Sequence, residues 1–202
     1  MNFAFFIYSF NYDFYSENLA ILKSRKIVIT GGPGTGKTSV INELKNQGYT
    51  CLEEISRQVT LDARKDGTEQ LFLTDPVEFS RRLLEGRIAQ FEEASSFPDP
   101  LIFIDRGIPD ILAYMHYINV PYPDFFKQAS KLHSYDHVFV LPPWASIFES
   151  DSERYENFDQ AKLIHENLLE TYSKFDYQLH EVPFGSIVHR ADFILDVLKE
   201  ND

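Results

Sequence analysis

The amino-acid sequence predicts an α/β fold in which helices cover both faces of a parallel β-sheet. Short apolar segments rich in β-branched residues alternate along the chain with longer segments of helical periodicity. The first of these predicted strands leads directly into a glycine-rich loop and then into a helix. The length of 202 residues fits one domain. We therefore expect a single sheet flanked by two helical layers.

The first half of the chain contains the predicted strand, loop and helix unit and the elements that follow it. Residues 26–30 are a β-branched run closed by glycine, which is typical of a buried parallel strand. The next apolar positions recur at helical spacing over residues 39–46 and end before Gly48, which signals a C-cap. The further elements predicted here are a strand over 49–53, a helix over 54–65, and a helix from Pro76, capped by Asp75, to about residue 95.

The second half repeats the alternation of strands and helices. Residues 101–105 are an apolar run that ends in a carboxylate, and residues 138–141 are a similar run. A weaker strand is predicted over 177–182, before a final helix for which Ser186 is the expected N-cap. The remaining predicted helices cover about 109–118, about 123–133, and the stretch that follows a charged segment and runs to about 175.

Composition and charge exclude several classes of protein. The net charge of −12 repels nucleic acids and anionic membrane surfaces, so we expect neither as a partner. The single cysteine, Cys51, excludes an internal disulfide framework and fits a reducing cytoplasm. Residues 1–24 form an aromatic-rich N-terminal arm with no basic residue before Lys23, which argues against a signal peptide. The catalytic domain is expected over residues 25–202.

The glycine-rich loop is a phosphate-binding motif. It matches G-x-x-x-x-G-K-[ST] at every fixed position and lies between a predicted strand and a predicted helix. Its amides and the helix dipole attract a triphosphate, Lys37 reaches the β- and γ-phosphates, and the Thr38 hydroxyl ligates Mg²⁺. This local cradle lets an acidic protein bind ATP. The candidate nucleotide-binding residues are Gly31, Gly32, Pro33, Gly34, Thr35, Gly36, Lys37, Thr38 and Ser39.

The carboxylate at the end of the third predicted strand is a candidate second ligand of Mg²⁺. Asp105 follows four apolar residues, as the acidic motif of P-loop nucleotidases requires. The next residue is Arg106, which cannot act as a base, whereas ATPase motors usually place glutamate there. A hydrolytic motor is therefore disfavoured. A strand-end ion pair without a catalytic role is the alternative interpretation of the Asp105-Arg106 pair.

These motifs together resemble a known family. The segments that carry the resemblance are Thr30-Gly-Gly-Pro-Gly-Thr-Gly-Lys-Thr38, Glu54-x-x-Arg57, Phe103-x-Asp-Arg-Gly107 and Asp151-x-x-Arg154-Tyr-Glu156. In this order they are similar to the NadR-like AAA ATPase/kinase domains, which are related to nucleoside and nucleotide kinases. The resemblance covers about residues 26–198. It implies a five-stranded parallel sheet of order 2-3-1-4-5 and a lid after strand four, here about residues 149–160.

The resemblance also suggests roles for charged residues outside the loop. Arg154 is the only cation of the predicted lid and is a candidate for stabilising the transferring phosphoryl group, or else a solvated charge. Glu54 is preferred to Glu53 as the acceptor-binding carboxylate, although an acidic first helical turn explains it equally well. Arg190 lies where adenine packs in related kinases, although an ordinary turn between strand and helix explains this segment equally well. Further candidates for binding the acceptor's charged groups are Arg57, Arg81, Arg82 and Arg87, although exposed helix faces explain these arginines equally well.

Two functions are consistent with the sequence. The first is a Mg²⁺- and ATP-dependent phosphotransferase that acts on a nucleoside-like or other small hydroxyl acceptor. In it, Lys37 binds phosphates, Arg106 and Arg154 stabilise the transferred charge, and Glu54 binds the acceptor. The second is a nucleotide-dependent switch that hydrolyses ATP slowly and acts through protein partners. The acceptor-side carboxylate and the lid arginine favour the first.

Overall fold

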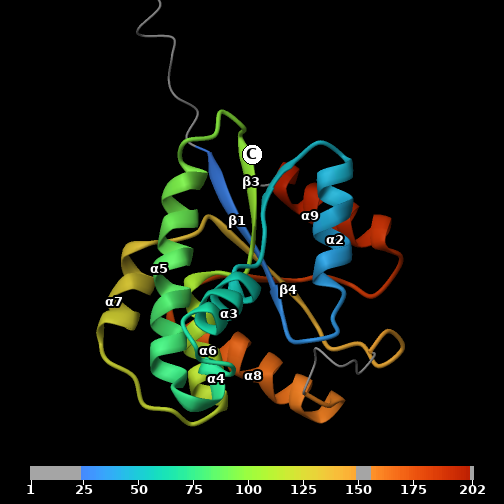
Figure 1. Cartoon of the computed structure of the whole chain (residues 1–202). Helices are drawn as coiled ribbons and strands as arrows, with labels where there is room; N and C mark the ends of the chain where they lie inside the picture. Colours follow the sequence, from blue (N-terminus) through green and yellow to red (C-terminus); the bar gives the residue numbers. More distant parts are fainter. Residues whose placement is uncertain (1–23, 149–155, 201–202) are drawn as a thin grey trace, which may run out of the picture.

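A computed structural model of the chain describes residues 24–148 and 156–200. The predicted α/β architecture is confirmed, because five parallel strands form one sheet with the order β2-β3-β1-β4-β5 (Figure 1). The strands are β1 (Arg25–Gly31), β2 (Thr50–Leu52), β3 (Leu101–Asp105), β4 (His137–Leu141) and β5 (Leu179–Glu181). The helices are α2 (Lys37–Asn46), α3 (Ser56–Lys65), α4 (Leu71–Thr74), α5 (Pro76–Ala94), α6 (Ile108–Tyr117), α7 (Phe125–Leu132), α8 (Phe158–Lys174) and α9 (Ile187–Glu200).

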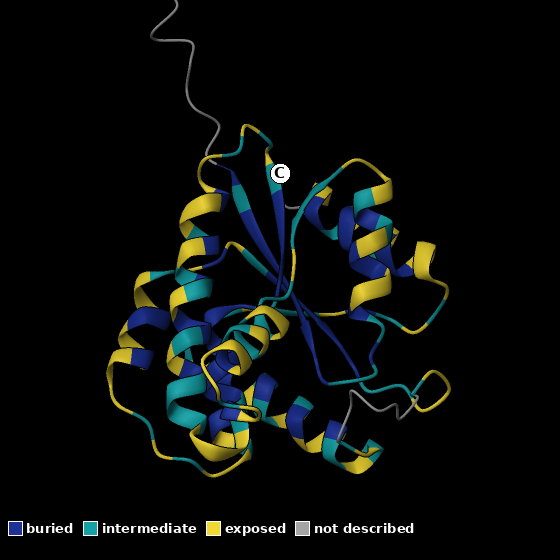
Figure 2. Cartoon of the chain, in the orientation of Figure 1, coloured by how far each residue is buried: buried dark blue, intermediate teal, exposed yellow. Residues whose placement is uncertain are grey.

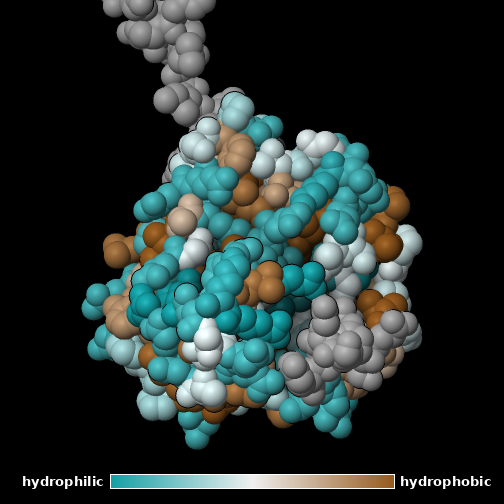
Figure 3. Space-filling model, in the orientation of Figure 1, coloured by the Kyte–Doolittle hydropathy of each residue, from teal (hydrophilic) through white to brown (hydrophobic). Residues whose placement is uncertain are grey.

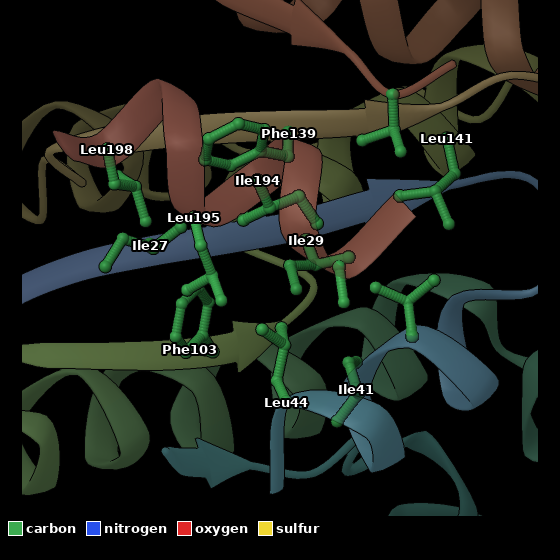
Figure 4. Close-up of a cluster of buried hydrophobic side chains, with 13 residues drawn as sticks. Ile27, Ile29, Ile41, Leu44, Phe103, Phe139, Leu141, Ile194, Leu195 and Leu198 are labelled. Atoms are coloured by element: carbon green, nitrogen blue, oxygen red, sulfur yellow. The ribbon is translucent and has the colours of Figure 1, made fainter. Parts of the chain in front are cut away.

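Alternate residues of the central strand point into two separate cores. Ile27 and Ile29 of β1 pack with α2 and α9 on one face of the sheet, as the close-up in Figure 4 shows. Val28, between them, packs with α5, α6 and α8 on the other face. This alternation is the period of two that a strand imposes on its side chains. The central strands are therefore buried on both faces, as their colour in Figure 2 shows.

The register of the strands brings their carboxyl ends together. Ile29 of β1 pairs with Asp105 of β3, and Gly31 pairs with Leu141 of β4. The loop between β1 and α2, the turn after β3 and the segment after β4 consequently start at the same edge of the sheet. Ligands of open parallel sheets bind at this edge, so the functional site is expected there.

Several local predictions differ from the structure or lie outside the described residues. Helix α3 begins at Ser56 rather than at residue 54, so Glu54 lies in the loop after β2. The short helix α4 was not predicted, because four residues are too few to show a period. The predicted caps at Asp75 and Ser186 are confirmed, since their side chains accept from Glu78 N at 3.0 Å and from His189 N at 3.2 Å.

Two predicted segments cannot be compared with the structure. Residues 1–23 of the aromatic arm, and residues 149–155 of the predicted lid with Arg154, lie outside the described residues. Ser24, which the sequence assigned to the arm, is buried and donates from Oγ to Phe97 O at 3.0 Å. No helix of the described ranges is both long and apolar enough to cross a lipid bilayer.

Candidate active site

The glycine loop turns tightly between β1 and α2, and its backbone approaches neighbouring groups closely. Gly34 and Gly36 have φ angles of 69° and 82°, in the left-handed region that favours glycine. A Cβ atom on Gly31 would lie 2.5 Å from Leu141 O, so only glycine fits beside β4. Helix α2 starts at Lys37, which places its N-terminal amides at the end of the loop. This is the geometry that binds a phosphate.

Lys37 is buried and folded back onto the loop. Its Nζ donates to Gly31 O and Gly32 O, both at 2.9 Å. Burial, with a further contribution from the positive charge of Arg106, lowers the pKa of Lys37 to about 7. The amino group thus lies in an environment that disfavours its positive charge. An anion bound at the loop would reverse that effect and favour the ammonium form.

Asp105, at the end of β3, is a buried carboxylate. Its Oδ1 is buried and accepts no hydrogen bond among the described residues, and burial raises the pKa of this carboxyl group. Thr38, the second residue of α2, is exposed. A hard cation such as Mg²⁺ prefers oxygen ligands of these two kinds and retains several waters or phosphate oxygens. The described residues contain no group of three or more His, Cys, Asp or Glu that would hold a metal alone.

Arg106 occupies a strained position at the centre of the site. Its φ angle is 72°, which is uncommon for a residue other than glycine, and its amide donates to Ile29 O at 3.1 Å. The guanidinium donates from Nη1 to Gly31 O at 3.1 Å and forms an ion pair from Nε with Glu54. Strained residues that the surrounding structure holds in place cluster at functional sites. Arg106 therefore joins the phosphate loop to the predicted acceptor side.

Glu54 is held in the site by two arginines. Besides the pair with Arg106, its Oε1 lies 3.5 Å from Arg87 Nη2 and accepts from Ser56 N at 3.2 Å. Burial opposes ionisation of Glu54, but the charges of Arg106 and Arg87 outweigh it and keep its pKa below the usual value. Glu53, by contrast, has a side chain that is 77% exposed and is paired with Lys45. The structure thus brings Glu54 and not Glu53 to the site.

Of the four candidate acceptor arginines, Arg87 lies in the site, and Arg57, the second residue of α3, is exposed. Arg87 is buried on α5 and donates to Gly107 O at 2.5 Å. Arg81 and Arg82 lie on the outer side of the same helix, where they pair with Glu78 and other surface carboxylates. Figure 3 shows the molecule in the orientation of Figure 1, and the side that it presents is mostly hydrophilic. The spacing along α5 could have indicated that Arg87 is buried, because Arg87 follows the buried Leu83 and Leu84 by four and three positions.

Arg190 contacts the backbone of the phosphate loop. It is only 2% exposed, and its Nη2 donates to Thr35 O at 2.8 Å. Its guanidinium carbon lies 5.9 Å from the ring centre of Trp144, which stacks on Phe184 with ring centroids 5.1 Å apart. Burial lowers the pKa of Arg190, and its Nε has no hydrogen-bond partner among the described residues. The aromatic pair at this end of the site is a surface on which a base could stack.

A buried carboxylate that is not one of the predicted site residues connects these parts. Asp110, near the start of α6, is 0% exposed. It accepts from Thr30 Oγ1 at 2.6 Å, from Tyr172 OH at 2.5 Å and from Gly107 N at 3.0 Å, and it pairs with Arg106 Nη1 at 3.3 Å. The spacing of Asp110 from Arg106 was visible in the sequence. The contributions of Thr30 and Tyr172 were not, because they come from distant parts of the chain.

Comparison with known proteins agrees with this architecture. The model of the AAA domain family matches residues 26–190. Among solved structures, a deoxyadenosine kinase from M. mycoides with the products dCMP and dCDP has a TM-score of 0.65 at 18% identity, covering 87% of this chain and 99% of that chain. The NadR protein in complex with NR has a TM-score of 0.65 at 17% identity and covers 88% of this chain and 50% of that chain.

A third similar structure is that of another kinase. The thymidylate kinase of Candida albicans has a TM-score of 0.62 at 14% identity and covers 89% of this chain and 92% of that chain. A search of curated proteins by sequence found no match. The predicted P-loop kinase fold, with its strand order 2-3-1-4-5, is thus confirmed.

Proposed function

Because the chain belongs to the AAA domain family, we propose that it is a Mg²⁺- and ATP-dependent phosphotransferase for a small acceptor that carries a hydroxyl group. The observation that carries this proposal is the partly buried Glu54 carboxylate, which Arg106 holds next to the phosphate loop. A hydrolase needs no second carboxylate at this place. A kinase needs one there to orient the acceptor hydroxyl.

The residues of the loop fit a magnesium-bound triphosphate. The amides at the start of α2 and the Lys37 ammonium would hold its phosphates, and Thr38 and Asp105 would hold Mg²⁺, directly or through water. The unpartnered Oδ1 of Asp105 supports the metal assignment, since a buried carboxylate oxygen without a donor is costly. When bound, ATP supplies the phosphoryl group that is transferred.

The transfer itself assigns one task to each charged group. The acceptor oxygen forms a bond to the γ-phosphorus while the bond between that phosphorus and the bridging oxygen of ADP breaks. Glu54 accepts the proton of the acceptor hydroxyl and later releases it to water. Arg106, with Arg154 from the predicted lid, stabilises the charge that spreads over the phosphoryl oxygens during transfer.

The charges near Glu54 favour an acceptor that carries no phosphate. Arg87 and Arg106 pair with Glu54, and Arg106 also pairs with Asp110, so two carboxylates already balance the two arginines. A nucleoside-like polyol brings no charge that needs further compensation. The names of similar structures, a deoxyadenosine kinase and the NadR protein with NR, agree with acceptors of this size. The stacked Trp144 and Phe184, close to Arg190, would bind the base of the triphosphate.

The proposal is tested by ADP release from MgATP over a panel of nucleosides and deoxynucleosides, with a nucleoside monophosphate as comparison. We expect at least one unphosphorylated acceptor to stimulate ADP release, and Glu54→Gln to lower kcat by about 100-fold or more. Glu53→Gln is the matched control, because it alters a neighbouring carboxylate on the exposed side. Slow ATP hydrolysis that no acceptor stimulates would support the nucleotide-dependent switch instead.

A further inference from the structure

Asp110 gathers contacts from three separate elements onto one carboxylate. Thr30 belongs to the end of β1, Gly107 and Arg106 to the turn before α6, and Tyr172 to α8. Neutral groups donate three of these contacts, and Arg106 is the one cation among the four. The carboxylate is fully buried and accepts hydrogen bonds from several donors. Its position is therefore strongly fixed.

The two oxygens of Asp110 act on two parts of Arg106. Oδ2 accepts from the amide of Gly107, which fixes the backbone directly after the left-handed Arg106. Oδ1 contacts the Nη1 atom of the Arg106 side chain at 3.3 Å, and the same nitrogen donates to Gly31 O at the start of the phosphate loop. One carboxylate therefore sets both the backbone turn and the direction of the guanidinium.

The remaining contacts of Arg106 leave one nitrogen available. Nε is paired with Glu54, and Nη1 is shared between Asp110 and Gly31 O. Nη2 makes no hydrogen bond within the described residues. It is also not among the side-chain nitrogens that are buried without a partner, so a ligand can reach it. A guanidinium held at two nitrogens presents the third in a fixed direction, because it is planar and rigid.

We infer that Asp110 is a positioning residue for phosphoryl transfer, which holds Arg106 so that Nη2 meets the terminal phosphoryl group of the bound nucleotide. This inference rests on the proposed function. Asp110 does not touch the substrate in this scheme. Thr30 and Tyr172 keep the carboxylate in place from β1 and α8, so the position of Arg106 depends on the packing of these elements around it.

The test compares Asp110→Asn with Tyr172→Phe in the full chain. Asp110→Asn keeps the size of the side chain and removes the charge that faces Arg106. Tyr172→Phe removes one donor from the same carboxylate and leaves the contact with Arg106. We expect Asp110→Asn to lower kcat by about 100-fold with the KM of the acceptor changed by less than about threefold, and Tyr172→Phe, which loosens the carboxylate but keeps its charge, to lower kcat by about tenfold or less. Folded Asp110→Asn protein with the parental kcat overturns the inference.

A second measurement does not depend on an acceptor. Arg106 is inferred to contact the terminal phosphoryl group, so it contributes to binding of MgATP and not of MgADP. Asp110→Asn should therefore bring the ratio of the two dissociation constants, measured by titration calorimetry, about tenfold closer to one. An unchanged ratio overturns the inference, even where no acceptor is found. If no acceptor stimulates the parent protein but this ratio shifts, the transfer proposal fails and the role of Asp110 in positioning Arg106 stands.

Two further variants keep the test valid if Asp110→Asn does not fold. Asp110→Ser retains a small polar group at the start of α6 and lacks the charge, so it should show the same losses. Arg106→Gln removes the group that Asp110 is inferred to position. In the Arg106→Gln background, Asp110→Ser should lower the rate by less than about twofold. Full additivity of the two losses would overturn the inference.

Discussion

Replacing Lys37 by methionine should make the nucleotide-free protein more stable. The ammonium group of Lys37 is buried, and its pKa is lowered from 10.5 to about 7. A difference of this size means that the charged form costs the folded state about 5 kcal/mol relative to the unfolded chain. The two hydrogen bonds to Gly31 O and Gly32 O, which the variant loses, contribute about 1.5 kcal/mol each. The expected net gain for Lys37→Met is about 2 kcal/mol at pH 6.

The pH dependence of this gain follows from the direction of the shift. Below about pH 7 the folded and the unfolded parent both carry the proton on Lys37, so the cost is fully present. As the pH rises from 7 toward 10.5, the folded parent loses the proton while the unfolded chain keeps it. The parent then recovers about 1.4 kcal/mol per pH unit, and the advantage of Lys37→Met shrinks accordingly.

The assay is urea unfolding at pH 6 and pH 8, followed by the fluorescence of Trp144, which is the one tryptophan of the chain. With MgATP at about 100 times its dissociation constant, the parent should gain about 2.7 kcal/mol and Lys37→Met close to nothing. Lys45→Met is the matched control on the same helix, with an expected change below about 1 kcal/mol. A variant that is less stable than the parent at pH 6, or equally stabilised by MgATP, would refute the reasoning.

Three other changes have definite expected outcomes. Gly31→Ala should lower the free energy of unfolding by about 2 kcal/mol or more, because the new Cβ would lie 2.5 Å from a main-chain oxygen of β4; an unchanged urea midpoint would contradict the close packing. Tyr172→Phe should cost about 1 to 3 kcal/mol in thermal unfolding, since Asp110 loses a buried donor. Arg154→Ala should lower kcat strongly at nearly constant nucleotide affinity, and equal losses in both would argue against a transition-state role.

Deleting residues 1–23 should leave MgATP binding intact, because the structure places Ser24 and the following strand within the domain. Titration calorimetry of the shortened chain checks this, and a large loss of affinity would assign the arm to the nucleotide site. The full-length protein, measured in the same buffer, is the control.

The sequence predicted those parts of the site whose residues lie close together along the chain. The phosphate motif has fixed spacing, so Lys37 and Thr38 could be assigned from it before any contact was known. Asp105 follows a run of four apolar residues, and its place at a strand end followed from that pattern. The strand order followed from the resemblance to a family, because a succession of predicted strands and helices alone allows several orders of the strands in the sheet.

Contacts between distant segments required the tertiary structure. Glu53 and Glu54 are neighbours in the sequence with the same charge, and the exit of β2 turned the second inward, where Arg87 and Arg106 keep it ionised. Arg87 and Arg81 lie on the same helix and differ in the same way, because Arg87 is buried and Arg81 is exposed. The chemistry of each of these glutamates and arginines depends on how far it is buried and on which charged residue it pairs with. Neither can be known from the type of residue.

The sequence alone therefore determined the class of fold and the glycine-rich loop, and it predicted that the site lies beside this loop. These features depend on local backbone preferences and on the alternation of apolar residues, which short segments encode. The structure decided which charges meet. Thr30 and Tyr172 are far apart along the chain, yet both donate to Asp110, because packing of β1, α6 and α8 brings them within hydrogen-bond distance. Such contacts depend on the whole fold, so no local pattern could have predicted them.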